Sequence, residues 1–313
     1  MRAVVCAPSP GSQQGTPMSK TIIAKFFLAV LFLCSLVSAG TVTAATVPPT
    51  MTNDDYFLYL PKNAATRGPL QVLVTVHGMG GDGPSFCQNL INRADADGFA
   101  IIAPTFQYHD YKVTANVTAD DSAMLPHLKQ IIDQLPERTG LTFKGKVILY
   151  GFSRGAQIVH RFAEFYPEQV LAVALFSAGS YTLPQTAMTT AGVPQNMAFP
   201  FGVADLSQYG SKDAFNSLAF RQIHFFVGVG GSDTNPGDTP RDWDITEGTT
   251  RVARAQTFAD TLTRMNMAAS FTMFPDVGHE VTPDMRATAM TFLEQQSAGY
   301  GNGNFSFALP FAR

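Results

Sequence analysis

The stretch Val147-Ile148-Leu149-Tyr150-Gly151-Phe152-Ser153-Arg154-Gly155 decides the fold of this chain. Its first four residues are apolar and β-favouring, which predicts a buried strand, and they lead straight into a turn bounded by Gly151 and Gly155. The apolar residues after the turn recur with helical spacing, at Ala156, Val159, Phe162 and Ala163. Strand, tight turn and helix in this order are typical of an α/β protein, and a serine stands at the turn.

Strand-like and helix-like patterns alternate on both sides of this unit. We expect strands at residues 70–77, 99–104, 147–150, 170–176, 223–229 and 270–274, each rich in β-branched or other apolar residues. We expect helices at 124–135, 251–265 and 283–295, where the apolar residues have helical spacing. The alternation predicts one α/β domain over residues 46–296, with a mostly parallel sheet flanked by helices.

Two stretches break this alternation. Residues 181–220 lie between consecutive expected strands and contain prolines, methionines and aromatic residues, among them Phe199 and Phe201. A connection this long and apolar is either a cap-like insertion that walls a cleft or a structural insertion packed on the body. Residues 299–313 are rich in glycine, asparagine and phenylalanine, and we expect a flexible tail there.

The first 45 residues have the pattern of a targeting segment. Residues 26–37 are almost uninterrupted apolar sequence after Lys25, and small residues follow at 37–39 and 42–44. We expect a signal peptide over 18–44, with Met18 as the start codon and 1–17 as an over-called extension. This predicts a secreted or periplasmic protein with no stable membrane insertion after cleavage. The alternative is a membrane anchor through residues 26–39.

Composition narrows the range of partners and cofactors. A net charge of −3 over 313 residues gives no electrostatic reason to expect nucleic acid. Cys87 is the one cysteine left after the expected cleavage, so no intramolecular disulfide is predicted. Residues 233–244 resemble a calcium loop only in part, because the glycine comes one place early and the terminal glutamate is absent. We expect no metal and no cofactor, and the oligomeric state stays open.

Ser153 needs a base to become a nucleophile, and the base needs an orienting acid. His279 lies in a glycine-bearing loop just after the last expected strand, which is the expected place for the base. His160 falls within the helix behind the turn, and His224 begins a strand, so both are poorly placed. We therefore predict that His279 is the base.

The acid is expected in the loop after the strand at 223–229. Asp233 is the first carboxylate past that strand, and Asp238, Asp242 and Asp244 follow in the same loop as weaker candidates. Asp276 is only three residues before His279 and is a poor candidate geometrically. Asp233 would accept the imidazole N–H and fix its tautomer.

Two backbone N–H groups are expected to bind a developing oxyanion. One belongs to Arg154, the residue after the serine. The other should come from His77-Gly78-Met79-Gly80-Gly81, which is similar to the glycine-rich oxyanion loops of lipases and esterases. Met79 is the first choice and Gly78 the second. His77 is expected to orient this loop by a hydrogen bond.

Together, His77-Gly78, the turn at Ser153, Asp233 and His279 resemble the α/β-hydrolase superfamily over nearly the whole mature chain. The resemblance implies a serine hydrolase that cleaves carboxylic esters through an acyl-enzyme, on a small-molecule, lipid or polymeric substrate. Phe152 fits the aromatic-Ser-Met pattern common in polyester-cleaving cutinases, but Arg154 stands in place of its methionine, so the substrate stays open.

Three aromatic residues are candidates for the substrate cleft: Phe199, Phe201 and Trp243. For Trp243 a packed core position is an equal alternative. Two other functions also stay open, a serine peptidase with the same triad and a catalytically silent binding protein on a hydrolase scaffold.

Overall fold

The computed structural model describes residues 50–52, 56–190, 192–210 and 213–300, all within the unit Thr46–Arg313. The expected extension, signal peptide and anchor lie outside the described residues, and so does the expected tail beyond residue 300. No helix in the described ranges combines the length and the hydrophobicity that a membrane span requires.

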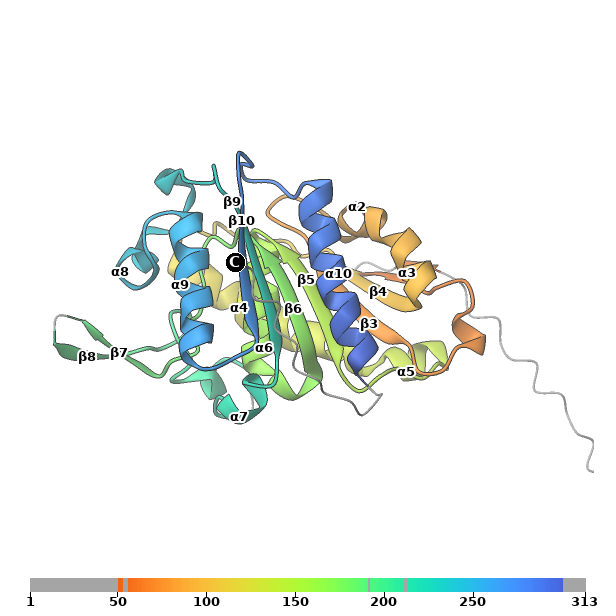
Figure 1. The fold of residues 1–313 in the computed structure, drawn as a ribbon. Helices are drawn as coiled ribbons and strands as arrows, with labels where there is room; N and C mark the ends of the chain where they lie inside the picture. Colours follow the sequence, from red (N-terminus) through yellow and green to blue (C-terminus); the bar gives the residue numbers. More distant parts are fainter. Residues whose placement is uncertain (1–49, 53–55, 191, 211–212, 301–313) are drawn as a thin grey trace, which may run out of the picture. The chain divides into compact units, whose positions relative to one another are not determined.

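An eight-stranded sheet forms the centre, in the order β1-β2-β4-β3-β5-β6-β9-β10 (Figure 1). The strands are β1 (Thr50–Thr52), β2 (Tyr56–Tyr59), β3 (Gln71–Val76), β4 (Phe99–Pro104), β5 (Val147–Phe152), β6 (Val170–Phe176), β9 (His224–Gly230) and β10 (Ala269–Phe274). In this order, each strand from β4 to β10 is parallel to its neighbour, whereas β2 runs antiparallel to both β1 and β4. This confirms the predicted mostly parallel sheet.

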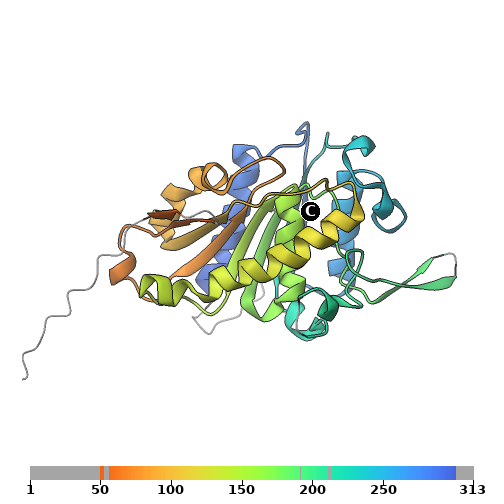
Figure 2. The ribbon, with the colours of Figure 1, turned by 180° about the vertical axis from the view of Figure 1, so that it is seen from behind.

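Helices cover both faces of the sheet. One face carries α4 (Thr114–Asp133), α6 (Arg154–Phe165) and α9 (Arg251–Arg264), with α4 outermost in Figure 2. The other carries α2 (Gly83–Cys87), α3 (Ile91–Asp97) and α10 (Pro283–Gly299), with α10 crossing the near face in Figure 1. Short helices α5 (Leu135–Thr139), α7 (Ser217–Phe220) and α8 (Asp244–Glu247) lie in the connections. Along β3, Val72 and Val74 enter the first core and Leu73 the second, so both faces of the strand are buried and its sequence is continuously apolar.

The insertion between β6 and β9 packs on the body of the protein. It contains the hairpin β7 (Ala187–Thr190) and β8 (Val193–Asn196), followed by α7. Phe199 is 4% exposed, and its ring packs edge-on against Phe165 of α6 at a centroid distance of 5.2 Å. These contacts support the alternative of a structural insertion.

Helix α6 is buried along its whole length, including its charged residues. Asp121 of α4 is fully buried and accepts hydrogen bonds from Arg154 and from Arg161, the latter at 2.6 Å. Arg161 also donates to Thr182 and Ser180, at the start of the insertion. The ion pairs therefore join α4 to α6, and the hydrogen bonds of Arg161 connect both helices to the start of the insertion. Sequence patterns did not predict this network.

Candidate active site

Ser153 occupies a strained turn between β5 and α6. Its backbone has φ 55° and ψ −117°, a region that residues with a side chain seldom adopt. A Cβ atom on Gly151 would lie 2.6 Å from the carbonyl oxygen of Gly155, and one on Gly155 would lie 2.0 Å from that of Val76. The two glycines thus allow β3, β5 and α6 to approach closely enough to form the turn.

Three side chains from separate loops meet at the carboxyl edge of the sheet. His279, after β10, has its Nε2 atom 2.9 Å from the Oγ of Ser153. The Nδ1 atom of the same ring lies 2.8 Å from Oδ2 of Asp233, which follows β9. The ring of Phe152 packs against His279 at a centroid distance of 4.8 Å. With Nδ1–H donating to the carboxylate, Nε2 is free to accept the serine proton.

Asp233 is 5% exposed, yet it favours the charged form. Burial alone raises its pKa, but the hydrogen bond from His279 and the nearby charge of Arg251 outweigh burial and hold the pKa below its ordinary value. Arg251 donates through Nη1 to Oδ1 of Asp233 at 3.1 Å. The carboxylate is therefore ionised at neutral pH.

The other candidate acids have different partners. Asp238 accepts from Asn235 at 2.8 Å, Asp242 accepts from Thr114, and Asp244 pairs with Arg254 at 2.9 Å. Asp276 lies in the loop before His279 with φ 60°. Of these five carboxylates, Asp233 is the one that forms a hydrogen bond with His279 in the described part of the chain.

The loop after β3 lies against the serine. A Cβ atom on Gly78 would be 3.1 Å from the Cβ of Ser153, and Gly78, Met79 and Arg154 all line the pocket that contains Ser153 and His279. Within the described part of the chain, the backbone N–H groups of Met79 and Arg154 donate to no other residue. Both groups are thus available to a ligand, and that of Arg154 adds the positive end of the α6 dipole.

His77 and His160 have structural partners. His77 donates through Nδ1 to the carbonyl of Gly78 at 2.7 Å and accepts from the N–H of Phe106 at 3.1 Å, so it ties the loop to the end of β4. Burial lowers the pKa of His77, which keeps the ring neutral. His160 is fully buried, donates to the carbonyl of Ala156 at 2.8 Å and accepts from the N–H of Thr182 at 3.0 Å.

The pocket beside Ser153 has a volume of about 370 Å³. Its lining consists of Gly78, Met79, Tyr111, Phe152, Ser153, Arg154, Gln157, Gly179, Asp238, Arg251 and His279.

The prediction that Phe199, Phe201 and Trp243 line this cleft is wrong. Phe199 belongs to the core, and Phe201 packs on Trp243 at a centroid distance of 4.6 Å. Trp243 is fully buried, and its indole N–H donates to the carbonyl of Tyr181 at 2.9 Å. A core position therefore buries the apolar ring and still pairs its one donor.

Sequence reasoning missed Tyr111, Gln157 and Arg251 as lining residues. Gln157 carried a usable signal, because it follows Ser153 by four residues in a predicted helix and therefore shares its face. Arg251 begins α9, and Tyr111 lies in the loop before α4. Neither position is marked in the sequence as part of the site.

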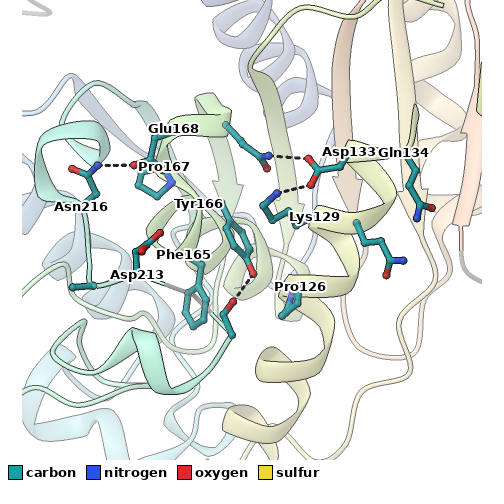
Figure 3. A pocket seen from close by; sticks show the side chains of 14 residues that line it. Pro126, Lys129, Asp133, Gln134, Phe165, Tyr166, Pro167, Glu168, Asp213 and Asn216 are labelled. Atoms are coloured by element: carbon teal, nitrogen blue, oxygen red, sulfur yellow. Dashed lines mark hydrogen bonds and ion pairs between the residues drawn. The ribbon is translucent and has the colours of Figure 1, made fainter. Parts of the chain in front are cut away.

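A larger pocket, about 930 Å³, lies between α4, the end of α6 and the segment before α7 (Figure 3). Its polar side chains largely satisfy one another. Gln169 donates to Asp133 at 2.9 Å, and Asn216 donates to Glu168 at 2.5 Å. The described residues that line it include no serine, cysteine or histidine, so it offers no nucleophile with a base. The smaller pocket is the candidate active site.

Comparison with known proteins agrees with this architecture. Residues 71–225 match the family model described as alpha/beta hydrolase fold. The chain is similar in structure to poly(aspartic acid) hydrolase-1 from Sphingomonas sp. KT-1, at 21% identity and a TM-score of 0.58, covering 76% of this chain and 92% of that one. It is also similar to a poly(3-hydroxybutyrate) depolymerase from Bordetella parapertussis, at 19% identity and a TM-score of 0.55, covering 78% and 83%. Among curated proteins, none matches. At these identities the likeness shows the fold alone.

Proposed function

The chain belongs to the α/β-hydrolase superfamily, and on that premise we propose that it is a serine hydrolase that cleaves carboxylic esters through an acyl-enzyme. The observation that carries this proposal is the continuous hydrogen-bonded chain from Ser153 Oγ through His279 to Asp233, at 2.9 and 2.8 Å. A nucleophile in contact with a base, and a base in contact with an orienting carboxylate, is the arrangement that activates a serine.

The residues of the site divide the steps of the reaction among them. The Oγ of Ser153 attacks the ester carbonyl while Nε2 of His279 takes its proton, and the carbonyl oxygen becomes an oxyanion. The N–H groups of Met79 and Arg154 are the proposed donors to that oxyanion, with Gly78 as the second choice for the loop donor. His279 then gives its proton to the leaving alcohol, and an acyl-enzyme remains. Water activated by His279 hydrolyses the acyl-enzyme and restores Ser153.

Secretion is part of the proposal. Its support is the apolar segment 26–37 with small residues on its carboxyl side, within the expected signal peptide 18–44. The proposed partners are small-molecule or polymeric esters, without nucleic acid.

The test measures catalysis and folding together. Purified protein is assayed on short-chain p-nitrophenyl esters beside an aminoacyl anilide, and it is labelled with a fluorophosphonate probe, which reacts with an activated serine. We expect ester turnover and labelling, with both lost in Ser153→Ala at an unchanged melting temperature. Ser85→Ala, at an exposed serine on α2, is the matched control and should retain both.

The rival functions give different results. Cleavage of the anilide in preference to the esters would identify a peptidase. Absence of both turnover and labelling in folded wild-type protein would identify a catalytically silent binding protein. Near-normal turnover in folded Ser153→Ala would reject Ser153 as the nucleophile.

A further inference from the structure

Gln157 lies one helical turn beyond Ser153 on α6. Its backbone N–H donates to the carbonyl of Ser153 at 3.3 Å, and its side chain lines the same pocket. Residues four apart on a helix lie on one face, about 6 Å apart along the axis. The side chain is only 1% exposed, so it is a buried polar group beside the proposed nucleophile.

Two arginines fix the orientation of the Gln157 amide. Its Oε1 atom accepts from Nη1 of Arg154 at 3.3 Å and from Nη1 of Arg161 at 3.2 Å. A guanidinium can only donate, so the amide oxygen must face the arginines and the NH₂ group must face away. Arg161 is itself held by Asp121 at 2.6 Å, so the amide cannot reverse without breaking buried hydrogen bonds.

The NH₂ group of Gln157 donates to no described residue, and its Nε2 atom is not among the polar atoms that are both buried and unpaired, so it stays accessible from the pocket. It lies beside Gly179, another lining residue, where an added Cβ atom would come within 3.0 Å of Nε2. Water can reach this donor in the free protein, but a bound acyl chain that covered it without supplying an acceptor would leave it unpaired. A ligand that brought an oxygen to this point would satisfy the donor.

The surroundings of Gln157 are also polar. Arg251 is 4% exposed, and its Nε atom is buried without a hydrogen-bond partner. Its Nη2 atom and the hydroxyl of Tyr111 both donate to the carbonyl of Asp238, at 2.7 and 3.1 Å. The large apolar side chains of the lining are Met79 and Phe152. A plain alkyl chain would leave the NH₂ group of Gln157 unpaired.

We propose that the NH₂ group of Gln157 binds the substrate and selects esters whose acyl part carries a second carbonyl oxygen a few carbons beyond the scissile one. This inference rests on the proposed function and names its substrate class. The selection is non-covalent, and the bonds made and broken are those of the hydrolysis already described. A site built around a donor discriminates against the analogue that lacks the acceptor, because the donor is then left buried and unpaired.

The experiment compares two esters that differ at one position of the acyl chain. The ratio of kcat/KM for p-nitrophenyl 4-oxopentanoate to that for p-nitrophenyl pentanoate is measured and divided by the ratio of their alkaline hydrolysis rates. We expect a corrected ratio of about ten for wild-type protein, the size of one neutral hydrogen bond. A wild-type ratio near one would overturn the inference without any variant.

Two variants test whether Gln157 causes the preference. Gln157→Glu keeps an oxygen for the arginines but replaces the donor with an acceptor, so the ratio should fall to about one or below. Gly179→Ala brings a methyl group to within 3.0 Å of Nε2 and should lower the ratio while leaving the arginines untouched. Gln130→Glu, at an exposed position of α4, is the matched control and should keep the wild-type ratio.

The outcomes separate this inference from the proposed function. A ratio that stays near ten in Gly179→Ala and in folded Gln157→Glu would overturn the role of Gln157 while ester hydrolysis stands. Wild-type protein that cleaves neither ester and takes up no fluorophosphonate would overturn the proposed function itself.

Discussion

Arg251 donates through Nη1 to Oδ1 of Asp233 at 3.1 Å, on the oxygen that His279 leaves free. The carboxylate is therefore held at both oxygens, by a cation on one side and by the imidazole on the other. The charge of Arg251 opposes protonation of Asp233, and its rigid fork opposes rotation of the carboxylate. Arg251 thus fixes the residue that orients His279.

Asp233→Asn is expected to lower kcat by about 10⁴. Arg251 can only donate, so the amide oxygen of the asparagine would face Arg251 and its NH₂ group would face Nδ1 of His279. The imidazole would then carry its proton on Nε2 and could not accept one from Ser153. The assay is turnover of a p-nitrophenyl ester beside a thermal melt. Turnover should fall far less in Asp238→Asn, Asp242→Asn and Asp276→Asn. If one of these three variants loses most of its turnover while Asp233→Asn keeps its own, the acid is another residue.

Phe199→Ala is expected to destabilise the fold by about 3–5 kcal/mol, because it removes a buried ring that packs on Phe165. The residue lies away from the pocket, so activity on acetate, butyrate and octanoate esters should fall in proportion to the folded fraction. Urea unfolding and the three assays check this. A selective loss on the octanoate ester, with stability retained, would restore the idea that the insertion contacts substrate.

Asp121→Ala is expected to lower the free energy of unfolding by about 3–5 kcal/mol, because it leaves Arg154 and Arg161 buried without their shared carboxylate. Asp133→Ala is the matched control on the same helix. Asp133 pairs with Lys129 at 2.5 Å near the surface, and loss of that pair should change stability by about 1 kcal/mol or less. Equal effects in urea unfolding would mean that the buried network contributes no more than a surface pair.

Glu247→Gln is expected to weaken the pH dependence of stability. Burial raises the pKa of Glu247 to about 8, against the opposing charge of Arg254, whereas the value in the unfolded chain is 4.5. Between these values the folded state binds more protons than the unfolded state, so the stabilisation is full below pH 4.5 and is lost as the pH rises towards 8. Glutamine stays neutral and can still accept the N–H of Tyr181. Urea unfolding measures the free energy of unfolding of both proteins at pH 5 and pH 8. The difference between Glu247→Gln and wild type should shift in favour of the variant by at least about 1 kcal/mol from pH 5 to pH 8. A constant difference would show that Glu247 does not titrate there.

The parallel strands were predictable because they are buried on both faces, which makes their sequences continuously apolar. The predicted strand at 99–104 has the same bounds as β4, and that at 170–176 the same bounds as β6. Helix α4 begins ten residues before the predicted start at 124, because Asp120 and Asp121 occupy its buried side. Hydrophobic periodicity cannot recognise a buried position that an ion pair satisfies. β2 was missed, being four residues long and antiparallel to its neighbours.

The meeting of Ser153, Asp233 and His279 also follows from topology. Each follows a different parallel strand, and the carboxyl ends of parallel strands share one edge of the sheet. Their catalytic roles stay a prediction. The pocket wall was harder to predict, since aromatic residues in a long connection suit a cleft and a core equally well. Phe199 is buried in the core. The polar wall of the pocket consists largely of Gln157 and Arg251, which only tertiary contacts bring together.

The left-handed backbone of Ser153 has a consequence for laboratory evolution. A residue with a side chain held at φ 55° is destabilised by about 1–3 kcal/mol, and glycine at the same position would be free of most of that strain. Screening random variants for heat resistance alone would therefore enrich Ser153→Gly, a better-folded protein without a nucleophile. Thermostable descendants of this chain would have to be selected for turnover at the same time.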